Sequence, residues 1–169
     1  MNTVIIIPAR YASTRYPGKP LAMLKGAFGK NMTLIERSWR AAKEVKGAQR
    51  VVVATDDERI KDEAERFGAE VIITSEQCKN GTERCAEAAD KLGNEYDIVV
   101  NFQGDAPLTP PWFVDDLINA LKEKPSFHVA TPVLRCDVAM VNDLLEDRRN
   151  SMVGGTTAVF SKDFSALYF

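Results

Sequence analysis

Short runs of apolar residues recur along the chain, and polar stretches with helical character lie between them. The apolar runs are continuous and rich in β-branched residues, which is typical of strands buried on both faces of a parallel sheet. We expect strands over residues 3–8, 50–55, 70–74, 97–103 and 127–133. The final stretch, TTAVFSKDFSALYF (156–169), also has the composition of strands.

The segments between these runs carry helix start and stop signals. Thr33 and Glu36 form a capping box, and Gly47 is a C-terminal stop for the helix that follows Thr33. Asp56 is the expected N-cap of the next helix. We expect helices over residues 33–47, 56–68, 82–93 and 110–124. Alternating strands and helices predict an α/β fold with a doubly wound, mostly parallel sheet, whose strand order the pattern does not determine.

Length and composition indicate one globular domain over residues 1–169. The three cysteines (Cys78, Cys85 and Cys136) are odd in number and lack C-x-x-C spacing, which argues against a disulfide framework or a zinc knuckle. With this cysteine usage, a reducing cytoplasm is the default expectation. No apolar run is long enough for a membrane span, so we expect no membrane partner. The exposed apolar ending suggests that the chain is part of a longer protein.

Charge is distributed unevenly along the chain. The net charge is −2, yet the first 35 residues carry five cations and no acid. Three of these cations (Arg10, Arg15 and Lys19) lie in the stretch IPARYASTRYPGKPL, directly after the first predicted strand. Cations confined to one loop favour a small anionic ligand over a nucleic acid. A solvated surface loop is the alternative on composition alone.

The loop after the first strand of an open α/β sheet is the usual phosphate-binding site. Here it lacks both G-x-G-x-x-G and G-x-x-x-x-G-K-[ST]. It offers arginine forks and a lysine instead of glycine amides. Pro17 and Pro20 restrict the backbone around Lys19, so less conformational entropy remains to be lost on binding.

The stretch IPARYASTRYPGKPL closely resembles the N-terminal signature of the CMP-sugar synthetases, a cytidylyltransferase family, and most closely its CMP-Kdo (3-deoxy-manno-octulosonate) branch. Three further stretches resemble the family in the expected order: VVVATDDERI (51–60), NGTERCAEA (80–88) and VVNFQGDAPL (99–108). The resemblance implies a Rossmann-like nucleotidyltransferase fold that uses CTP and Mg²⁺. The implied reaction joins CMP to the anomeric hydroxyl of an acidic 2-keto-3-deoxy sugar and releases pyrophosphate.

The resemblance also implies roles for individual residues. Arg10, Lys19 and Asp105 would be catalytic, and Asp105 would bind the metal. The implied nucleotide-binding residues are Ala9, Arg10, Ser13, Arg15, Lys19, Gly81, Thr82 and Gln103. Simpler interpretations remain open: Asp105 as a turn cap, Gln103 as a polar residue at a strand end, and Gly81-Thr82 as a helix N-terminus without a ligand.

The sequence departs from the family pattern in two places. The segment LKGAFGKNMTLIER (24–37) is longer than the compact turn typical of the family, and one motif differs. The usual string is QGDEP, whereas this chain reads QGDAP, with Ala106 in place of the acid. The family chains are also longer, and their remaining part normally supplies a second metal-binding Asp, much of the sugar pocket and the homodimer interface. A nucleotide-binding relative or fragment without catalysis is therefore the alternative function. The resemblance further implies a product used for bacterial surface polysaccharide, such as lipopolysaccharide.

Overall fold

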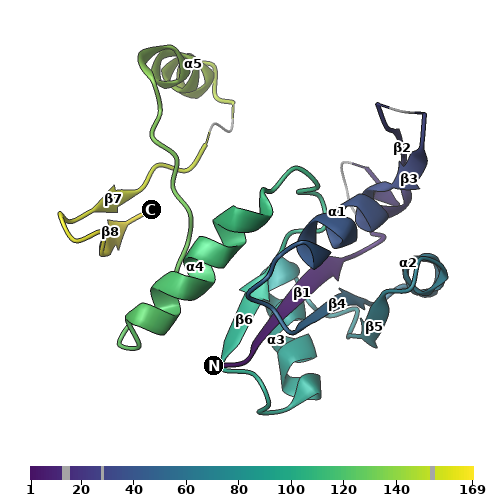
Figure 1. Cartoon of the computed structure of the whole chain (residues 1–169). Helices are drawn as coiled ribbons and strands as arrows, with labels where there is room; N and C mark the ends of the chain where they lie inside the picture. Colours follow the sequence, from purple (N-terminus) through teal and green to yellow (C-terminus); the bar gives the residue numbers. More distant parts are fainter. Residues whose placement is uncertain (13–15, 28, 153–154) are drawn as a thin grey trace. The chain divides into compact units, whose positions relative to one another are not determined.

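The computed structural model of the chain describes residues 1–12, 16–27, 29–152 and 155–169 (Figure 1). The chain divides into two compact units, Met1–Ala130 and Thr131–Phe169, each of which is described by itself. The expectation of a single domain over residues 1–169 stays a prediction. Among the described residues, no helix has both the length and the apolar character that crossing a bilayer would require.

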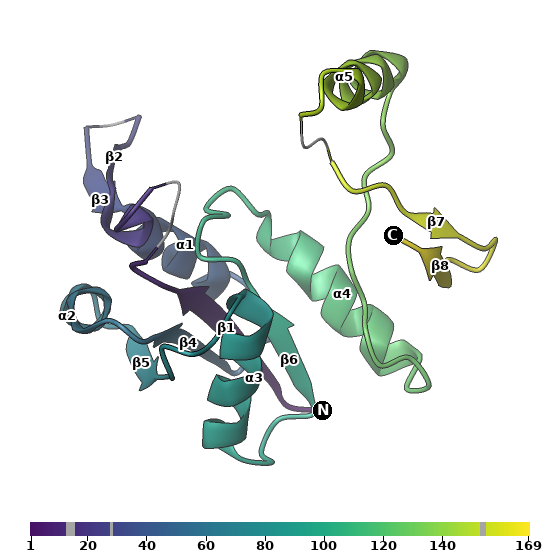
Figure 2. The same cartoon turned by 180° about the vertical axis from the view of Figure 1, so that it is seen from behind.

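A four-stranded parallel sheet lies at the centre of the first unit (Figures 1 and 2). Its strands are β1 (Thr3–Ala9), β4 (Arg50–Thr55), β5 (Glu70–Ile73) and β6 (Ile98–Asn101). They lie in the order β5–β4–β1–β6, so β1 pairs in parallel with both β4 and β6. The direction of strand succession reverses between β1 and β6, and ligands bind at such switch points.

Helices cover both faces of this sheet. Leu34–Lys43 (α1), Glu58–Arg66 (α2) and Pro111–Glu123 (α4) pack on one face, and Gly81–Leu92 (α3) packs on the other (Figures 1 and 2). Within β1, Ile5 faces the first group of helices and Ile6 faces α3, and both are fully buried. The continuous apolarity of β1 is thus explained by burial on both sides, and the predicted Rossmann-like α/β fold class is confirmed.

A long connection, residues 10–33, joins β1 to α1. It contains the 3₁₀ turn η1 (Lys19–Leu21) and an antiparallel hairpin of β2 (Met23–Lys25) and β3 (Asn31–Thr33). Arg37 of α1 holds this hairpin, because its Nη2 donates to the Leu24 carbonyl oxygen at 2.9 Å.

The N-cap predicted for α1 is confirmed, whereas the Gly47 stop of α1 and the Asp56 cap of α2 are wrong. Helix α1 ends at Lys43, with Glu44 as its C-cap. The Thr33 hydroxyl oxygen accepts from the Glu36 backbone N–H at 3.3 Å, as the capping box predicts. The N-cap of α2 is Asp57, whose Oδ1 accepts from the Arg59 backbone N–H at 3.0 Å, and not Asp56. Asp56 instead forms an ion pair inside the pocket wall, as described below.

The second unit contains helix α5 (Val138–Arg149) and a hairpin of β7 (Val159–Phe160) and β8 (Ala166–Tyr168). The strand character predicted for residues 156–169 is thus confirmed in part. The strand predicted for residues 127–133 is wrong, because the described backbone there is irregular. Phe127 and Val129 are 41% and 82% exposed, so this apolar run has no described layer to pack against.

Candidate functional site

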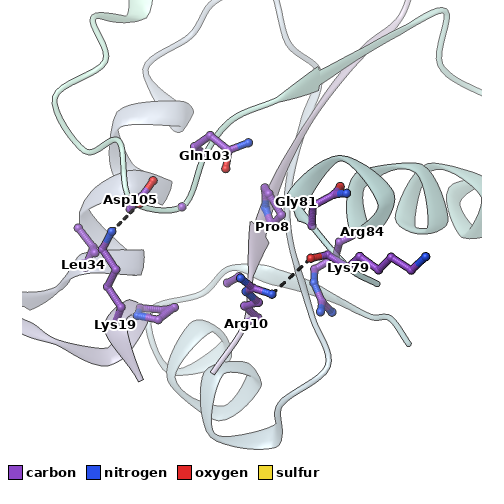
Figure 3. Close-up of a pocket in the computed structure, with 13 residues that line it drawn as sticks. Pro8, Arg10, Lys19, Leu34, Lys79, Gly81, Arg84, Gln103 and Asp105 are labelled. Atoms are coloured by element: carbon purple, nitrogen blue, oxygen red, sulfur yellow. Dashed lines mark hydrogen bonds and ion pairs between the residues drawn. The ribbon is translucent and has the colours of Figure 1, made fainter. Parts of the chain in front are cut away.

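A cavity of about 280 Å³ lies at the carboxyl edge of the sheet, where the strand order reverses (Figure 3). Three segments form it: the loop after β1, the loop after β6 and the N-terminal end of α3. The lining residues are Pro8, Ala9, Arg10, Lys19, Pro20, Leu34, Lys79, Asn80, Gly81, Arg84, Gln103, Gly104 and Asp105. The sheet topology therefore unites motifs that lie far apart in the sequence.

The charged residues that line the cavity are predominantly cationic. They include four cations, Arg10, Lys19, Lys79 and Arg84, against the one carboxylate of Asp105. The Arg10 guanidinium donates from Nη1 to the Lys79 carbonyl oxygen at 3.4 Å, which links the β1 loop to the segment before α3. Such a concentration of positive charge in a concave site attracts anions.

One ion pair joins the two loops that follow β1 and β6. Lys19 Nζ lies 2.6 Å from Asp105 Oδ2, and the two side chains are 45% and 50% exposed (Figure 3). Because solvent screens a pair of this exposure, it adds little to stability. Both groups remain accessible to a ligand.

Arg84 supplies the buried charge of the pocket wall. Its side chain is 2% exposed and donates from Nη2 to Asp56 Oδ2 at 2.9 Å. It also donates from Nη1 to the Thr74 hydroxyl. A guanidinium with both ends held cannot swing away, so Arg84 is a fixed cation at the site. Asp56, expected to cap α2, provides the compensating charge that allows this burial.

Gly81 and Gln103 lie against each other at the α3 side of the cavity. A Cβ on Gly81 would lie 3.1 Å from Pro8 Cγ and 3.3 Å from Gln103 Oε1, so a larger residue would crowd this wall. Gln103 Nε2 donates to Asn101 Oδ1 at 2.8 Å, which orients the Gln103 amide. Thr82 lies beside this pair, where its hydroxyl oxygen accepts from Asn101 Nδ2 at 3.5 Å, and does not line the cavity.

The backbone that delivers Asp105 is packed tightly against β1. A Cβ on Gly104 would lie 2.8 Å from the Pro8 carbonyl oxygen, a distance that only glycine avoids. The buried Ser38 hydroxyl of α1 donates to the Gly104 carbonyl oxygen at 2.8 Å. These two contacts fix the QGDAP turn, and they hold the Asp105 backbone beside the end of β1.

The structure brings most of the predicted site residues together. Those that line the cavity are Ala9, Arg10, Lys19, Gly81, Gln103 and Asp105. Two predicted nucleotide ligands, Ser13 and Arg15, lie outside the described residues. The roles assigned to all of these residues stay predictions.

Sequence reasoning missed Lys79, Arg84 and Gly104. A signal existed for Arg84, because it precedes the buried Cys85 and lies four residues before the buried Ala88 on α3. An arginine on the buried face of a helix requires a partner, and DD at 56–57 offered one. Lys79 had no comparable signal, since it lines the cavity through its position before the α3 N-cap, Asn80.

The one carboxylate that lines the cavity fits a magnesium ion held jointly with a nucleotide. Among the described residues, no group of three or more His, Cys, Asp or Glu side chains is arranged to hold a metal. Mg²⁺ needs only one or two protein carboxylates when phosphate oxygens and water complete its octahedron. Asp105, half-exposed at the cavity, provides one such carboxylate.

Comparisons with known proteins agree with this geometry. A family model described as cytidylyltransferase matches residues 4–149. The 3-deoxy-manno-octulosonate cytidylyltransferase of Maricaulis maris (strain MCS10) is 46% identical over 169 residues, which cover 100% of this chain and 63% of that protein. The 8-amino-3,8-dideoxy-manno-octulosonate cytidylyltransferase of Shewanella sp. (strain W3-18-1) is 39% identical over 171 residues, covering 100% of this chain and 64% of that protein.

A solved structure is also similar. The CMP:2-keto-3-deoxy-manno-octonic acid synthetase complexed with CTP matches with a TM-score of 0.69 and 37% sequence identity. The match covers 75% of this chain and 50% of that chain. This chain thus spans less than two thirds of the length of the relatives it matches.

Proposed function

Since this chain belongs to the cytidylyltransferase family, we propose that it transfers CMP from CTP to the anomeric hydroxyl of an acidic 2-keto-3-deoxy sugar and releases pyrophosphate. The observation that carries this proposal is the cationic cavity at the switch point, which the family motifs line together. A triphosphate is the anion that such a site suits, because its four cations still outnumber the carboxylates of Asp105 and of Asp56, the partner of Arg84.

The proposed reaction is an in-line displacement at the α-phosphorus of CTP. The sugar hydroxyl oxygen forms a bond to this phosphorus, the bond to the bridging oxygen breaks, and the hydroxyl proton passes to solvent. Catalysis of such a transfer consists mainly of positioning and charge neutralisation. Arg10 and Lys19 would hold the triphosphate and neutralise the departing pyrophosphate, and Lys79 and Arg84 add positive charge to the same wall.

Asp105 would hold Mg²⁺ together with the phosphates. Bound there, Mg²⁺ would neutralise phosphate charge and orient the reacting group. The ion pair with Lys19 places the carboxylate and the ammonium at one point of the cavity, so both can contact the same triphosphate. The nucleobase and ribose would lie against Gly81 and the oriented amide of Gln103, which can both donate and accept.

The relatives bear on the choice of sugar. One is named for 3-deoxy-manno-octulosonate and another for its 8-amino-3,8-dideoxy form. We therefore propose an eight-carbon acidic sugar of this kind, whose activated form would supply lipopolysaccharide or a related surface polysaccharide. Residence in the cytoplasm and assembly as a homodimer stay predictions that follow from the family.

A second candidate is nucleotide binding without catalysis. Ala106 favours it, because the usual family motif has an acid directly after the metal-binding Asp. The loss of one nearby carboxylate would weaken metal binding while leaving the cationic wall intact. This candidate retains selective CTP binding and lacks turnover.

The test is pyrophosphate release from CTP by the 169-residue chain, with and without 3-deoxy-manno-octulosonate and Mg²⁺. Release that requires both is the expected result, and Asp105→Asn should abolish it. Ala106→Glu is the matched variant on the adjacent position, and it should retain or increase the rate. CTP binding without pyrophosphate release would support the second candidate. Absence of both CTP binding and pyrophosphate release would contradict both candidates.

A further inference from the structure

The loop that carries Arg10 and Lys19 is closed at its base by one aromatic residue. The Gly18 backbone N–H donates to the Tyr11 carbonyl oxygen at 2.9 Å, so this hydrogen bond joins Tyr11 and Gly18 across the loop. Arg10 immediately precedes this closure and Lys19 immediately follows it. The positions of both cations therefore depend on the geometry of the Tyr11–Gly18 pair.

The Tyr11 ring packs directly against Gly18. Gly18 has φ = 69°, a left-handed conformation that glycine adopts without strain. A Cβ at this position would lie 2.9 Å from Tyr11 Cε2 and 3.1 Å from Cζ. The glycine thus serves both the backbone turn and the close approach of the ring.

Helix α2 supports the ring from the other side of the connection. The Arg59 guanidinium carbon lies 3.3 Å from the centroid of the Tyr11 ring, a stacked cation–π contact. The guanidinium is held in place by Asp57, with Nε to Oδ1 at 3.0 Å and Nη2 to Oδ2 at 2.6 Å. Asp57 is itself fixed as the N-cap of α2. A continuous chain of contacts therefore runs from a rigid helix to the loop base.

None of these three side chains lines the cavity, and the catalytic proposal above does not use them. We propose that Tyr11, Arg59 and Asp57, here called the Tyr11–Arg59 stack, are positioning residues that hold Arg10 and Lys19 where these two cations can bind the phosphates of the nucleotide. This inference rests on the proposed function. The stack acts on the phosphates alone, because the α3 and β6 residues that face the base are separate from it.

The test compares CTP, CMP and inorganic tripolyphosphate as calorimetric ligands of the full chain. Arg59→Ala removes an exposed side chain and should weaken CTP and tripolyphosphate binding by about threefold to tenfold, the scale of a stacked cation–π contact. Tyr11→Ala should weaken both by about tenfold or more, because the ring itself is lost. CMP binding should change by less than about twofold in either variant, since one phosphate engages little of the loop.

Two control variants separate positioning from general damage. Tyr11→Phe keeps the ring and should restore CTP binding to within about twofold of the original chain. Phe127→Ala removes the aromatic partner of another cation–π pair, with Lys124 Nζ 5.3 Å from the ring centroid, and should leave all three ligands unaffected. Melting temperatures measured alongside identify any variant that fails to fold, and Arg59→Ala then carries the test.

The outcomes distinguish this inference from the proposed function. Unchanged CTP and tripolyphosphate affinity in a folded Arg59→Ala or Tyr11→Ala variant would overturn the positioning role of the stack and leave the proposed function intact. A parallel loss of CMP binding would also overturn it, because a general structural role produces that result. If the stack variants weaken tripolyphosphate binding but the original chain does not prefer CTP over tripolyphosphate, the positioning role of the stack is supported and the proposed function fails. Absence of binding to all three ligands would overturn both.

Discussion

The two units of the chain differ in where their apolar residues lie. In Met1–Ala130, the apolar residues of β1 from Val4 to Ile7 are fully buried between helices on both faces. In Thr131–Phe169, helix α5 buries no residue, and Leu134 and Val138 are 75% and 79% exposed. The first unit therefore contains both a packed core and the cavity. Burial within the second unit contributes little to stability.

The largest expected effect lies in the core of the first unit. Ile6→Ala removes a fully buried side chain and should lower the free energy of unfolding by about 2–5 kcal/mol. Urea denaturation of the variant and the original chain gives this difference. A loss below about 1 kcal/mol would show that the sheet is not packed against α3 as described.

A slightly smaller effect is expected at the wall of the cavity. Arg84→Met leaves Asp56 without its partner and should destabilise the fold by about 3 kcal/mol, the lower end for buried pairs because the Asp56 side chain is still 15% exposed. Pairing it with Asp56→Asn should recover part of this loss. Thermal unfolding of the single and double variants measures the coupling. Additive losses would contradict the ion pair.

Sequence patterns predicted the parts of the fold whose burial is complete within the described chain. The strands at β1 and β4 were predicted to within one residue, because continuous β-branched runs there are covered on both faces. The run at 127–133 has the same composition, yet it forms no strand in the described chain. Apolar composition indicates that a segment tends to be buried. Whether the segment forms a strand depends on a neighbouring layer, which only the tertiary structure provides.

The candidate site also contains residues that sequence motifs predicted and residues that only the packing of the chain brings to the cavity. Arg10, Lys19 and Asp105 were predicted because they lie in motifs at strand ends, and the topology brings strand ends to one edge. Lys79 reaches the cavity through its position before α3, which no local pattern specifies, whereas the burial pattern of α3 could have indicated Arg84. Asp56 was assigned to the wrong contact, since either of two adjacent aspartates can cap a helix and only packing selects between them.

An acid-dependent effect is expected where α3 meets the segment after β5. The Glu87 carboxylate contacts Lys91, Cys78 and the Ser75 backbone N–H, which lower its pKa from 4.5 to about 2. A carboxyl group whose pKa is lowered by folding stabilises the fold above its ordinary pKa, and this stabilisation is lost as the pH falls through the folded value. Glu87→Gln should therefore lower the melting temperature at neutral pH, and its deficit should shrink below pH 4.5.

Melting temperatures measured from neutral to acidic pH check this window. Glu76→Gln, at an exposed glutamate of the same connection, is the matched control and should behave like the original chain. A Glu87→Gln deficit that stays constant down to about pH 2 would contradict the assigned contacts.

The smallest effect is expected in the second unit. Leu145 lies on α5 and is 43% exposed, so Leu145→Ala should change the free energy of unfolding by less than about 0.5 kcal/mol. Urea denaturation beside Ile6→Ala provides the comparison in one experiment. A loss as large as that of Ile6→Ala would overturn the contrast between the two units.

The proposed function requires that the cavity at the switch point binds CTP. Calorimetric titration of the full chain with CTP, UTP and ATP, each with and without Mg²⁺, measures this binding. We expect selective CTP binding that Mg²⁺ strengthens and that Lys19→Met weakens by about 1.5–3 kcal/mol, the scale of a charge-assisted hydrogen bond. Equal binding of all three nucleotides, or no binding of any, would contradict it.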